Sequence, residues 1–381
     1  MDRSTGMKSD VATAPNEREE DFGGVFTRLR VNSSADLPPP DLSVIDVAVL
    51  DMNCGWPNLG HDLLVRAVGE IADDLSPLLD AAGVRIRTIS YDIRGRQIIP
   101  EAPGNRHLLY LGTGGPGHIN PNQNDGVSPG TQGIREDPSW EAPLYRLFDR
   151  IRANEDAALL SVCHTFGVLC RWSDVAQPVL RSAEIGGKSV GVRENILTTE
   201  GRDHPWFSRF ASELPDGRHL SVVDSRLFDL IPKAEGFPDG VTPIGYESLE
   251  PGGMRGQAVT MLEFARDKGG VMPRMLAVNH HPEARDNRLQ QRVLRQKLSR
   301  GEVSEEWYAE RDRTLRDSFS SRETRLRVVL TSQYTLMAPL RFHIYRQVRL
   351  RAERESRRVG FHEDNVFRLP SGTMERERND F

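Results

Sequence analysis

The stretch LLSVCHTFGVLCRW, residues 159–172, decides how this chain is interpreted, because its apolar run breaks at Cys163 and His164 and then resumes. The preceding residues 157–163 predict a buried strand, and 167–180 predict the start of a helix. Two interpretations remain open. Cys163 is either a small core residue in an ordinary turn, or a nucleophile at a sharp corner, where the start of a helix offers free backbone N–H groups and favours the reactive thiolate.

Strand and helix patterns alternate on both sides of this stretch. Strands are predicted at 43–52, 84–93, 106–113 and 157–163, and helices at 63–83 and 142–155. Without hairpin signals between them, these segments predict an α/β fold with a mostly parallel sheet flanked by helices. Ligands of such sheets bind beyond the carboxyl ends of the strands. The loops that start at Cys54, Thr113 and Cys163 are therefore expected along one edge.

The chain divides into three parts by composition. Residues 1–43 are polar and end in DLPPPDLS, which predicts a disordered N-terminal segment. Residues 44–285 form the α/β domain, whose later part, after about residue 186, has short strand-like segments. Residues 286–381 predict a charged helical extension with a disordered end, in which Pro339 begins or kinks a helix. This extension could pack on the domain, mediate dimerisation or dock another subunit.

Composition and charge exclude several classes of protein. The 381 residues carry a net charge of −5 and three cysteines, whose spacing is not that of a zinc site, so we expect a reducing cytoplasm. No apolar run approaches the roughly 18 residues of a membrane helix. From Ala284 onward there are 22 Lys and Arg against 15 Asp and Glu, but their signs alternate at helical spacing. This pattern favours a solvated helix surface over nucleic-acid binding.

A second polar cluster follows a predicted strand in MLAVNHHPEARD, residues 275–286. His281 is separated by one proline from Glu283, whose carboxylate could orient the imidazole as a base for a cysteine. A polar turn is the plain alternative. Adjacent histidines could also suggest a metal, but we find no further ligands at workable spacing, so no metal is predicted.

A third candidate is the glycine-rich loop in LLYLGTGGPGHINP, residues 108–121. GTGGPG leaves its backbone amides open to close approach, which an oxyanion hole requires. Phosphate binding competes with this interpretation. However, the run matches neither GxGxxG nor the P-loop pattern, so no nucleotide cofactor is expected. The long loop 113–140 is either a lid or a surface insertion.

Together these motifs resemble the class I glutamine amidotransferase family, which has a Cys–His–Glu triad, a GGP loop, a G-x-C-x-G-x-Q elbow and an HPE ending. GGP at 114–116, Cys163 and HPE at 281–283 occur here in the family's order, and HPWF at 204–207 also fits, so the resemblance spans about residues 45–285. The resemblance implies a flavodoxin-like fold that needs no cofactor. It also implies residue roles: Cys163 as nucleophile, His281 as base, Glu283 as its orienting acid, Gly115 and His164 as oxyanion hole, and Gly114, Pro116 and Gly167 as substrate-binding residues.

The elbow departs from the family pattern. It has Thr165 in place of a glycine, and Gly167 in place of the glutamine that helps to hold the substrate. The leading expectation is hydrolysis of the glutamine side-chain amide through a cysteinyl thioester, with ammonia released to an acceptor or a synthetase partner. A cysteine-dependent hydrolase or acyltransferase acting on another amide, γ-glutamyl or ester substrate is an alternative. A catalytically silent binding or regulatory protein is another. A homo-oligomer is also possible.

Overall fold

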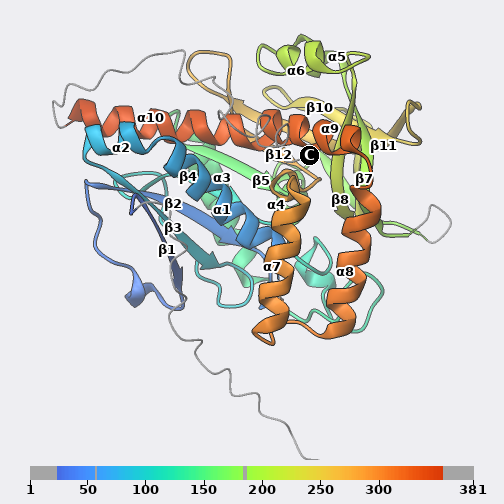
Figure 1. Ribbon diagram of the computed structural model, residues 1–381, viewed down its shortest axis with the longest axis horizontal. Coiled ribbons are helices and arrows are strands. Elements are labelled where there is room, and N and C mark those ends of the chain that lie inside the picture. The colour runs from blue at the N-terminus through green and yellow to red at the C-terminus, as the bar shows by residue number, and fades with distance from the viewer. Residues whose placement is uncertain (1–23, 56–57, 183–186, 355–381) are drawn as a thin grey trace, which may run out of the picture.

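The computed structural model describes residues 24–55, 58–182 and 187–354, and within them one large sheet organises the molecule (Figure 1). Its ten strands have the order β1-β3-β2-β4-β5-β12-β11-β10-β7-β8, and β6 and β9 form a separate two-stranded ladder. The strands are β1 (Phe26–Val31), β2 (Val44–Asp51), β3 (Arg85–Asp92), β4 (His107–Gly112), β5 (Ala158–Val162), β6 (Ala176–Leu180), β7 (Ser189–Leu197), β8 (His219–Arg226), β9 (Phe228–Pro232), β10 (Thr242–Ser248), β11 (Arg255–Arg266) and β12 (Pro273–Val278).

The half of the sheet from β1 to β12 is entirely parallel. If β2, β3, β4, β5 and β12 are numbered along the chain, their order is 2-1-3-4-5, the flavodoxin-like arrangement. The prediction of a mostly parallel α/β sheet is therefore confirmed. The other half, from β12 to β8, pairs antiparallel and extends the sheet beyond that core.

Helices cover both faces of the parallel half. The helices that connect its strands are α1 (Leu59–Asp74), α2 (Ser76–Ala82), α3 (Glu141–Ala153) and α4 (His164–Trp172). Strand β2 is buried on both faces, since Val47 and Val49 join the core beneath α1 and α2, whereas Ala48 and Leu50 join the core beneath α3 and α4. Such two-sided burial is why this strand has a continuous apolar sequence.

Short helices complete the domain. The antiparallel half carries α5 (Thr199–Asp203) and α6 (Phe207–Glu213). Single 3-10 turns lie at Ser34–Asp36, Pro121–Gln123, Pro138–Trp140 and Pro282–Ala284. The predicted helix 63–83 is divided in two, because Pro77 starts α2 after Leu75. Gly83 ends α2 in the left-handed conformation, as expected of a C-terminal cap.

The expectation of disorder is wrong for residues 24–43, and residues 1–23 lie outside the described residues. Phe26–Val31 forms β1, which pairs in parallel with β3 over six residues. Phe26 and Val31 are buried, while Arg28 and Arg30 are exposed. A short edge strand with alternating arginines becomes stable only through its partner strand, so the local sequence carries little signal for it.

The helix expected from residue 167 onward ends earlier than predicted. α4 ends at Trp172, and Asp174 has a φ of 56°, a left-handed turn conformation. The next segment, Ala176–Leu180, forms β6, which pairs antiparallel with β9. The pairing with a strand some fifty residues away overrides the apolar pattern that had suggested a continued helix.

The extension is helical and charged, as predicted. It consists of α7 (Asn287–Ser299), α8 (Glu305–Ser318), α9 (Arg322–Ser332), a π-helical turn (Gln333–Met337) and α10 (Ala338–Arg354). Pro339 is the second residue of α10 and follows directly after the π-helical turn, inside a helical run that continues from α9 into α10. In Figure 1, α7 and α8 lie side by side, and α10 runs across the sheet, where it contacts α2, β4 and β12.

The buried face of α10 explains why it lies on the domain. Leu340, Ile344 and Val348 are spaced four residues apart and are fully buried in the same core as α1. The expectation that the extension packs on the domain is therefore met for α10. The predicted disordered end, residues 355–381, lies outside the described residues. Among those described, no helix has both the length and the apolar character needed to span a membrane.

Candidate active site

Cys163 occupies a sharp corner between β5 and α4. Its φ of 48° and ψ of −106° are rare for a residue with a side chain, and such a conformation costs about 1–3 kcal/mol. The Cys163 backbone N–H donates to the carbonyl oxygen of Val278 at 2.8 Å, which ties the corner to the end of β12. The cysteine side chain lines a cavity, so the sharp corner, and not an ordinary turn, describes this position.

His281 and Glu283 lie beside this corner, in the turn after β12. The His281 Nδ1 and a Glu283 carboxylate oxygen are 2.8 Å apart, and the Glu283 side chain is buried. Burial lowers the pKa of His281, but the Glu283 carboxylate and the Cys163 sulfur raise it more, so that it lies well above its usual value. The structure thus brings together the three residues that the sequence proposed as a triad.

His280, the other histidine of the pair, points elsewhere. It is buried, and its Nε2 lies 3.4 Å from the hydroxyl oxygen of Thr335 in the extension. Burial and the adjacent His281 lower the pKa of His280 to about 3, so its ring is neutral. Ser332, also from the extension, donates its hydroxyl to the carbonyl oxygen of Pro282 at 2.6 Å. The extension therefore holds the turn that carries His281 and Glu283.

The GGP loop passes very close to neighbouring backbone. A Cβ at Gly115 would lie 2.2 Å from the carbonyl oxygen of Met52, so only glycine fits there. A Cβ at Gly114 would lie 3.0 Å from the His281 ring and 3.4 Å from the Cys163 Cβ. Gly115 and Pro116 line the cavity, whereas Gly114 fits between the cysteine and the histidine.

His164 presents its backbone N–H at the start of α4, where a helix has no internal acceptor for it. Its ring is buried and lines the cavity. Burial, together with the charge of Arg94, lowers the pKa of His164 well below its usual value, although a hydrogen bond to the Gly115 backbone opposes the shift. The ring is neutral at pH 7 and links α4 to the GGP loop.

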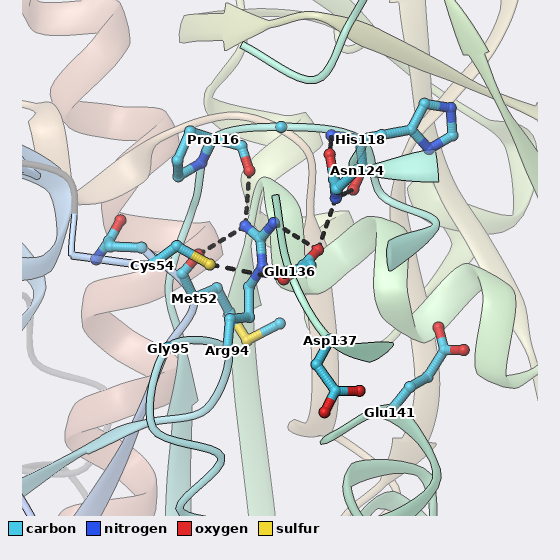
Figure 2. A network of polar contacts seen from close by, with 12 residues as sticks. Met52, Cys54, Arg94, Gly95, Pro116, His118, Asn124, Glu136, Asp137 and Glu141 are labelled. Atoms are coloured by element: carbon cyan, nitrogen blue, oxygen red, sulfur yellow. Dashed lines mark hydrogen bonds and ion pairs between the residues drawn. The ribbon is translucent and has the colours of Figure 1, made fainter. Parts of the chain in front are cut away.

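A buried ion pair fixes the glycine-rich loop in place (Figure 2). Arg94 and Glu136 form a two-pronged pair with both N–O distances at 2.8 Å, and their side chains are 0% and 2% exposed. Arg94 Nη1 also donates to the carbonyl oxygens of Met52 and Pro116. Asn124 donates to the same Glu136 carboxylate at 2.6 Å. One guanidinium therefore joins the loops that follow β2, β3 and β4.

The sequence did not identify Arg94 or Glu136 as part of the site. The available signal was weak: Arg94 directly follows a predicted strand, and Glu136 lies in a polar loop. The same network settles the open question about loop 113–140, because Gly117, Ile119 and Gln132 from this loop line the cavity. The loop is a fixed wall of the site and is tied down by Glu136.

The two departures from the family elbow have structural counterparts. Thr165 donates its hydroxyl to the Thr113 carbonyl oxygen at 2.7 Å, and its methyl group occupies the space that a side chain at Gly112 would need. A Cβ at Gly167 would lie 2.5 Å from the Ile119 side chain. Ile119 lines the cavity, whereas Gly167 is buried and is not among the lining residues, so contact of Gly167 with substrate stays a prediction.

The cavity beside Cys163 has a volume of about 150 Å³. In another protein, a cavity of about this size accommodates benzene, so the space suits a small acyl group. Besides the residues above, its walls include Asn58 at the start of α1, Asn279 after β12, and Trp307 and Arg311 from α8. No motif or spacing in the sequence indicated that α8 would reach the site.

The other two cysteines have different surroundings. Burial raises the pKa of Cys54 to about 12; the Arg94 charge opposes this shift and the Glu136 charge adds to it. The Cys54 thiol therefore stays protonated, and its sulfur lies 3.6 Å from Glu136 Oε2. Cys170 is fully buried within α4, as predicted for a core residue. Within the described ranges, no three His, Cys, Asp or Glu residues are grouped so that they could hold a metal ion.

Comparison with known proteins gives a distant structural likeness. No protein-family model matches the sequence, and no curated protein matches it. Among solved structures, the chain is similar to a "putative GMP synthase" component from Thermoplasma acidophilum, with a TM-score of 0.33 and 13% identity over 63% of this chain and 84% of that one. A likeness this distant carries no argument about function, which has to come from the site.

Proposed function

We propose that the protein is a cysteine-dependent amide hydrolase of the glutamine amidotransferase type. The observation that carries this proposal is the strained conformation of Cys163, whose φ is 48°, beside a histidine that is 2.8 Å from a buried carboxylate. Strain of this kind persists where the surrounding structure imposes it, and it clusters at catalytic positions. Glutamine is the amide that the family resemblance implies.

The first chemical step forms a thioester. The Cys163 thiolate attacks the carbonyl carbon of the amide, and the carbonyl electron pair moves to oxygen. Backbone N–H groups of Gly115 and His164 would hold this oxyanion, each contributing on the order of 3 kcal/mol. When the intermediate collapses, the C–N bond breaks, and His281 gives its proton to the leaving nitrogen, which departs as ammonia.

The second step returns the free enzyme. A water molecule attacks the thioester carbon while His281 takes one of its protons. Collapse breaks the C–S bond, which releases a carboxylic acid and the thiolate. Glu283 orients the ring through both steps and stabilises its protonated form, consistent with the raised pKa of His281. Delivery of the ammonia to a synthetase partner and a cytoplasmic setting stay predictions.

The direct test is covalent trapping. An electrophilic analogue of a small carboxylic amide should add to Cys163, which intact-protein mass and peptide mapping would detect, and Cys163→Ala should give no adduct. Cys54→Ala is the matched control, because that thiol is protonated and hydrogen-bonded outside the triad. Ammonia release from small amides should require Cys163 and His281.

Two outcomes would redirect the proposal. If Cys163 reacts with iodoacetamide no faster than an ordinary thiol and no amide releases ammonia, the protein is a silent binding protein with this fold. If Cys163 reacts rapidly but only ester or γ-glutamyl substrates are consumed, the thioester mechanism at Cys163 stands. The leaving group is then an alcohol or a substituted amine in place of ammonia.

A further inference from the structure

Besides His281, the cavity beside Cys163 is lined by three Lys and Arg side chains, Lys188, Arg226 and Arg311. In the part of the chain that the structure describes, no Asp or Glu lines it. A small polar cavity with this charge balance attracts an anion and disfavours a cation. The cations therefore indicate which kind of substrate can enter.

The three cations differ in how far their charges are balanced. Arg226 is surrounded by carboxylates, with Asp224 at 3.4 Å, Asp229 at 3.3 Å and Glu247 at 2.9 Å. Its charge is therefore compensated within the protein. Lys188 and Arg311, in contrast, form no ion pair with any of the described residues. They are the two cations that can take up an external negative charge.

Lys188 and Arg311 also lie close to one another and to the catalytic centre. Burial, then the charge of Arg311, lowers the pKa of Lys188, while a negative charge on the Cys163 sulfur raises it. The Arg311 guanidinium lies 5.5 Å from the centroid of the Trp307 ring, which is a cation–π arrangement on the same helix. Two like charges in a partly buried site repel, and an anion placed between them relieves this repulsion.

We infer that the acyl chain of the substrate ends in a carboxylate bound by Lys188 and Arg311, and that it carries no ammonium group. This inference rests on the proposed hydrolysis at Cys163 and names its substrate class. Free glutamine has both a carboxylate and an ammonium group. The carboxylate has two partners here, but the ammonium has no acidic side chain along the described walls of the cavity.

The shape of the elbow supports the same conclusion. Ile119 fills the space in front of Gly167, where the resembled family has a glutamine that helps to hold its substrate. An apolar side chain there cannot hydrogen-bond an amino-acid head group. A dicarboxylic acid monoamide, such as glutaramate or succinamate, meets the remaining requirements: a primary amide for Cys163, a short methylene chain for the apolar wall, and a carboxylate for the two cations.

The binding test uses the full-length Cys163→Ala protein, so that no turnover interferes. Glutarate and its neutral counterpart glutaramide are titrated by calorimetry. We expect glutarate to bind at least about tenfold more tightly, because a hydrogen bond to a charged group contributes roughly 1.5–3 kcal/mol. Adding Arg311→Ala or Lys188→Ala should remove the preference, and Arg311→Lys should restore part of it. The matched control is Arg313→Ala, an exposed arginine two residues away on α8.

The kinetic test compares ammonia release from glutaramate, glutamine and butyramide by the wild-type protein. We expect kcat/KM to be highest for glutaramate, by about tenfold or more over butyramide, and the advantage to be lost in Arg311→Ala but kept in Arg313→Ala. If all three amides are hydrolysed equally well, or glutamine is preferred, the inference is wrong while the proposed hydrolase function stands.

The binding test and the kinetic test can fail independently, so they distinguish the anion site from the proposed hydrolysis. If no amide is hydrolysed although glutarate binds through Lys188 and Arg311, the proposed hydrolysis fails and the anion site remains. If glutaramide binds as tightly as glutarate, or neither binds, or Arg311→Ala leaves glutarate binding unchanged, the anion site is refuted.

Discussion

Gly115 shows how strictly single residues determine this site. Its backbone passes so close to the Met52 carbonyl oxygen that a methyl group would overlap it, at 2.2 Å. Cys163 is similarly constrained, because its left-handed φ is unusual for a residue with a side chain. At both positions the chemistry depends on the path of the backbone, and the side chain follows from it.

Gly115→Ala should therefore disable the reaction while the protein still folds. The added methyl group displaces the GGP loop and removes one oxyanion donor, so we expect kcat to fall by about 100-fold or more. Steady-state ammonia release and circular dichroism would measure the two effects. Gly104→Ala is the matched control, because a Cβ there meets its nearest neighbour only at 3.7 Å and should leave kcat unchanged. If Gly115→Ala keeps the wild-type kcat, the Gly115 N–H does not contribute to the oxyanion hole.

Glu283 sets the upper pH limit of the proposed reaction. His281 must be protonated to release ammonia, and its raised pKa keeps it protonated as the pH rises. Glu283→Gln removes the negative charge that raises this pKa, so the pKa falls. We expect the alkaline limb of the kcat/KM profile to move to lower pH.

A pH series of ammonia release for wild type and Glu283→Gln measures this shift directly. Glu323→Gln removes an exposed carboxylate of α9 and should leave the profile where it is. An alkaline limb at the same pH in Glu283→Gln would mean that this carboxylate does not govern His281.

At the scale of secondary-structure elements, the site is held by contacts between loops that follow different strands. The pair of Arg94 and Glu136 joins the ends of β2, β3 and β4. Arg94, after β3, donates to the carbonyl oxygens of Met52, after β2, and Pro116, after β4, and it pairs with Glu136 in the same loop as Pro116. A buried ion pair contributes little net stability, but the loss of one partner is costly because the other charge stays buried. The pair therefore acts as a single positioning unit.

Glu136→Gln should be strongly destabilising. It leaves the Arg94 charge buried without its partner, and we expect a loss of about 3–5 kcal/mol, seen as a lower unfolding temperature. The same substitution at Glu353, whose ion pair with Arg349 is 55% exposed on both sides, should cost less than about 1 kcal/mol. Equal losses of stability from the two substitutions would show that the Glu136 carboxylate does not stabilise the buried Arg94 charge.

At the scale of the whole molecule, the C-terminal extension is part of the domain that carries the site. α10 buries its apolar face in the core of the sheet, Ser332 holds the turn of His281 and Glu283, and α8 lines the cavity. A boundary after residue 285 therefore marks a change in sequence pattern but not an independent folding unit.

Deletion of residues 338–381 should prevent stable folding. Leu340, Ile344 and Val348 are among the side chains lost from the core, each worth about 1.5–3 kcal/mol when fully buried. Their sum is comparable to the roughly 5–15 kcal/mol that stabilises a typical domain. Thermal unfolding and size-exclusion chromatography would detect the loss. Deletion of residues 355–381 alone leaves α10 in place and should keep a cooperative transition. If the protein lacking residues 338–381 still unfolds in a cooperative thermal transition, α10 is not required for folding.

The sequence by itself determined the α/β architecture and most of the candidate triad's neighbourhood. Apolar runs of strand and helix length, with a cysteine, a glycine-rich loop and an HPE turn at strand ends, are local patterns. In a parallel sheet, such strand ends meet at one edge. For this reason Cys163, His281 and Glu283 could be named as neighbours before any distance was known.

Only the tertiary structure decided the rest. β1 forms through its partner β3, Arg94 is paired with Glu136 in a loop 42 residues away in sequence, and Arg311 lines the same cavity as Lys188 from a helix beyond the predicted domain. Each of these depends on contacts between segments distant in the chain, which no local periodicity encodes. The physical reason is that the stability of a short strand, and the role of a buried charge or an unpaired cation, depend on the residues that surround it in space.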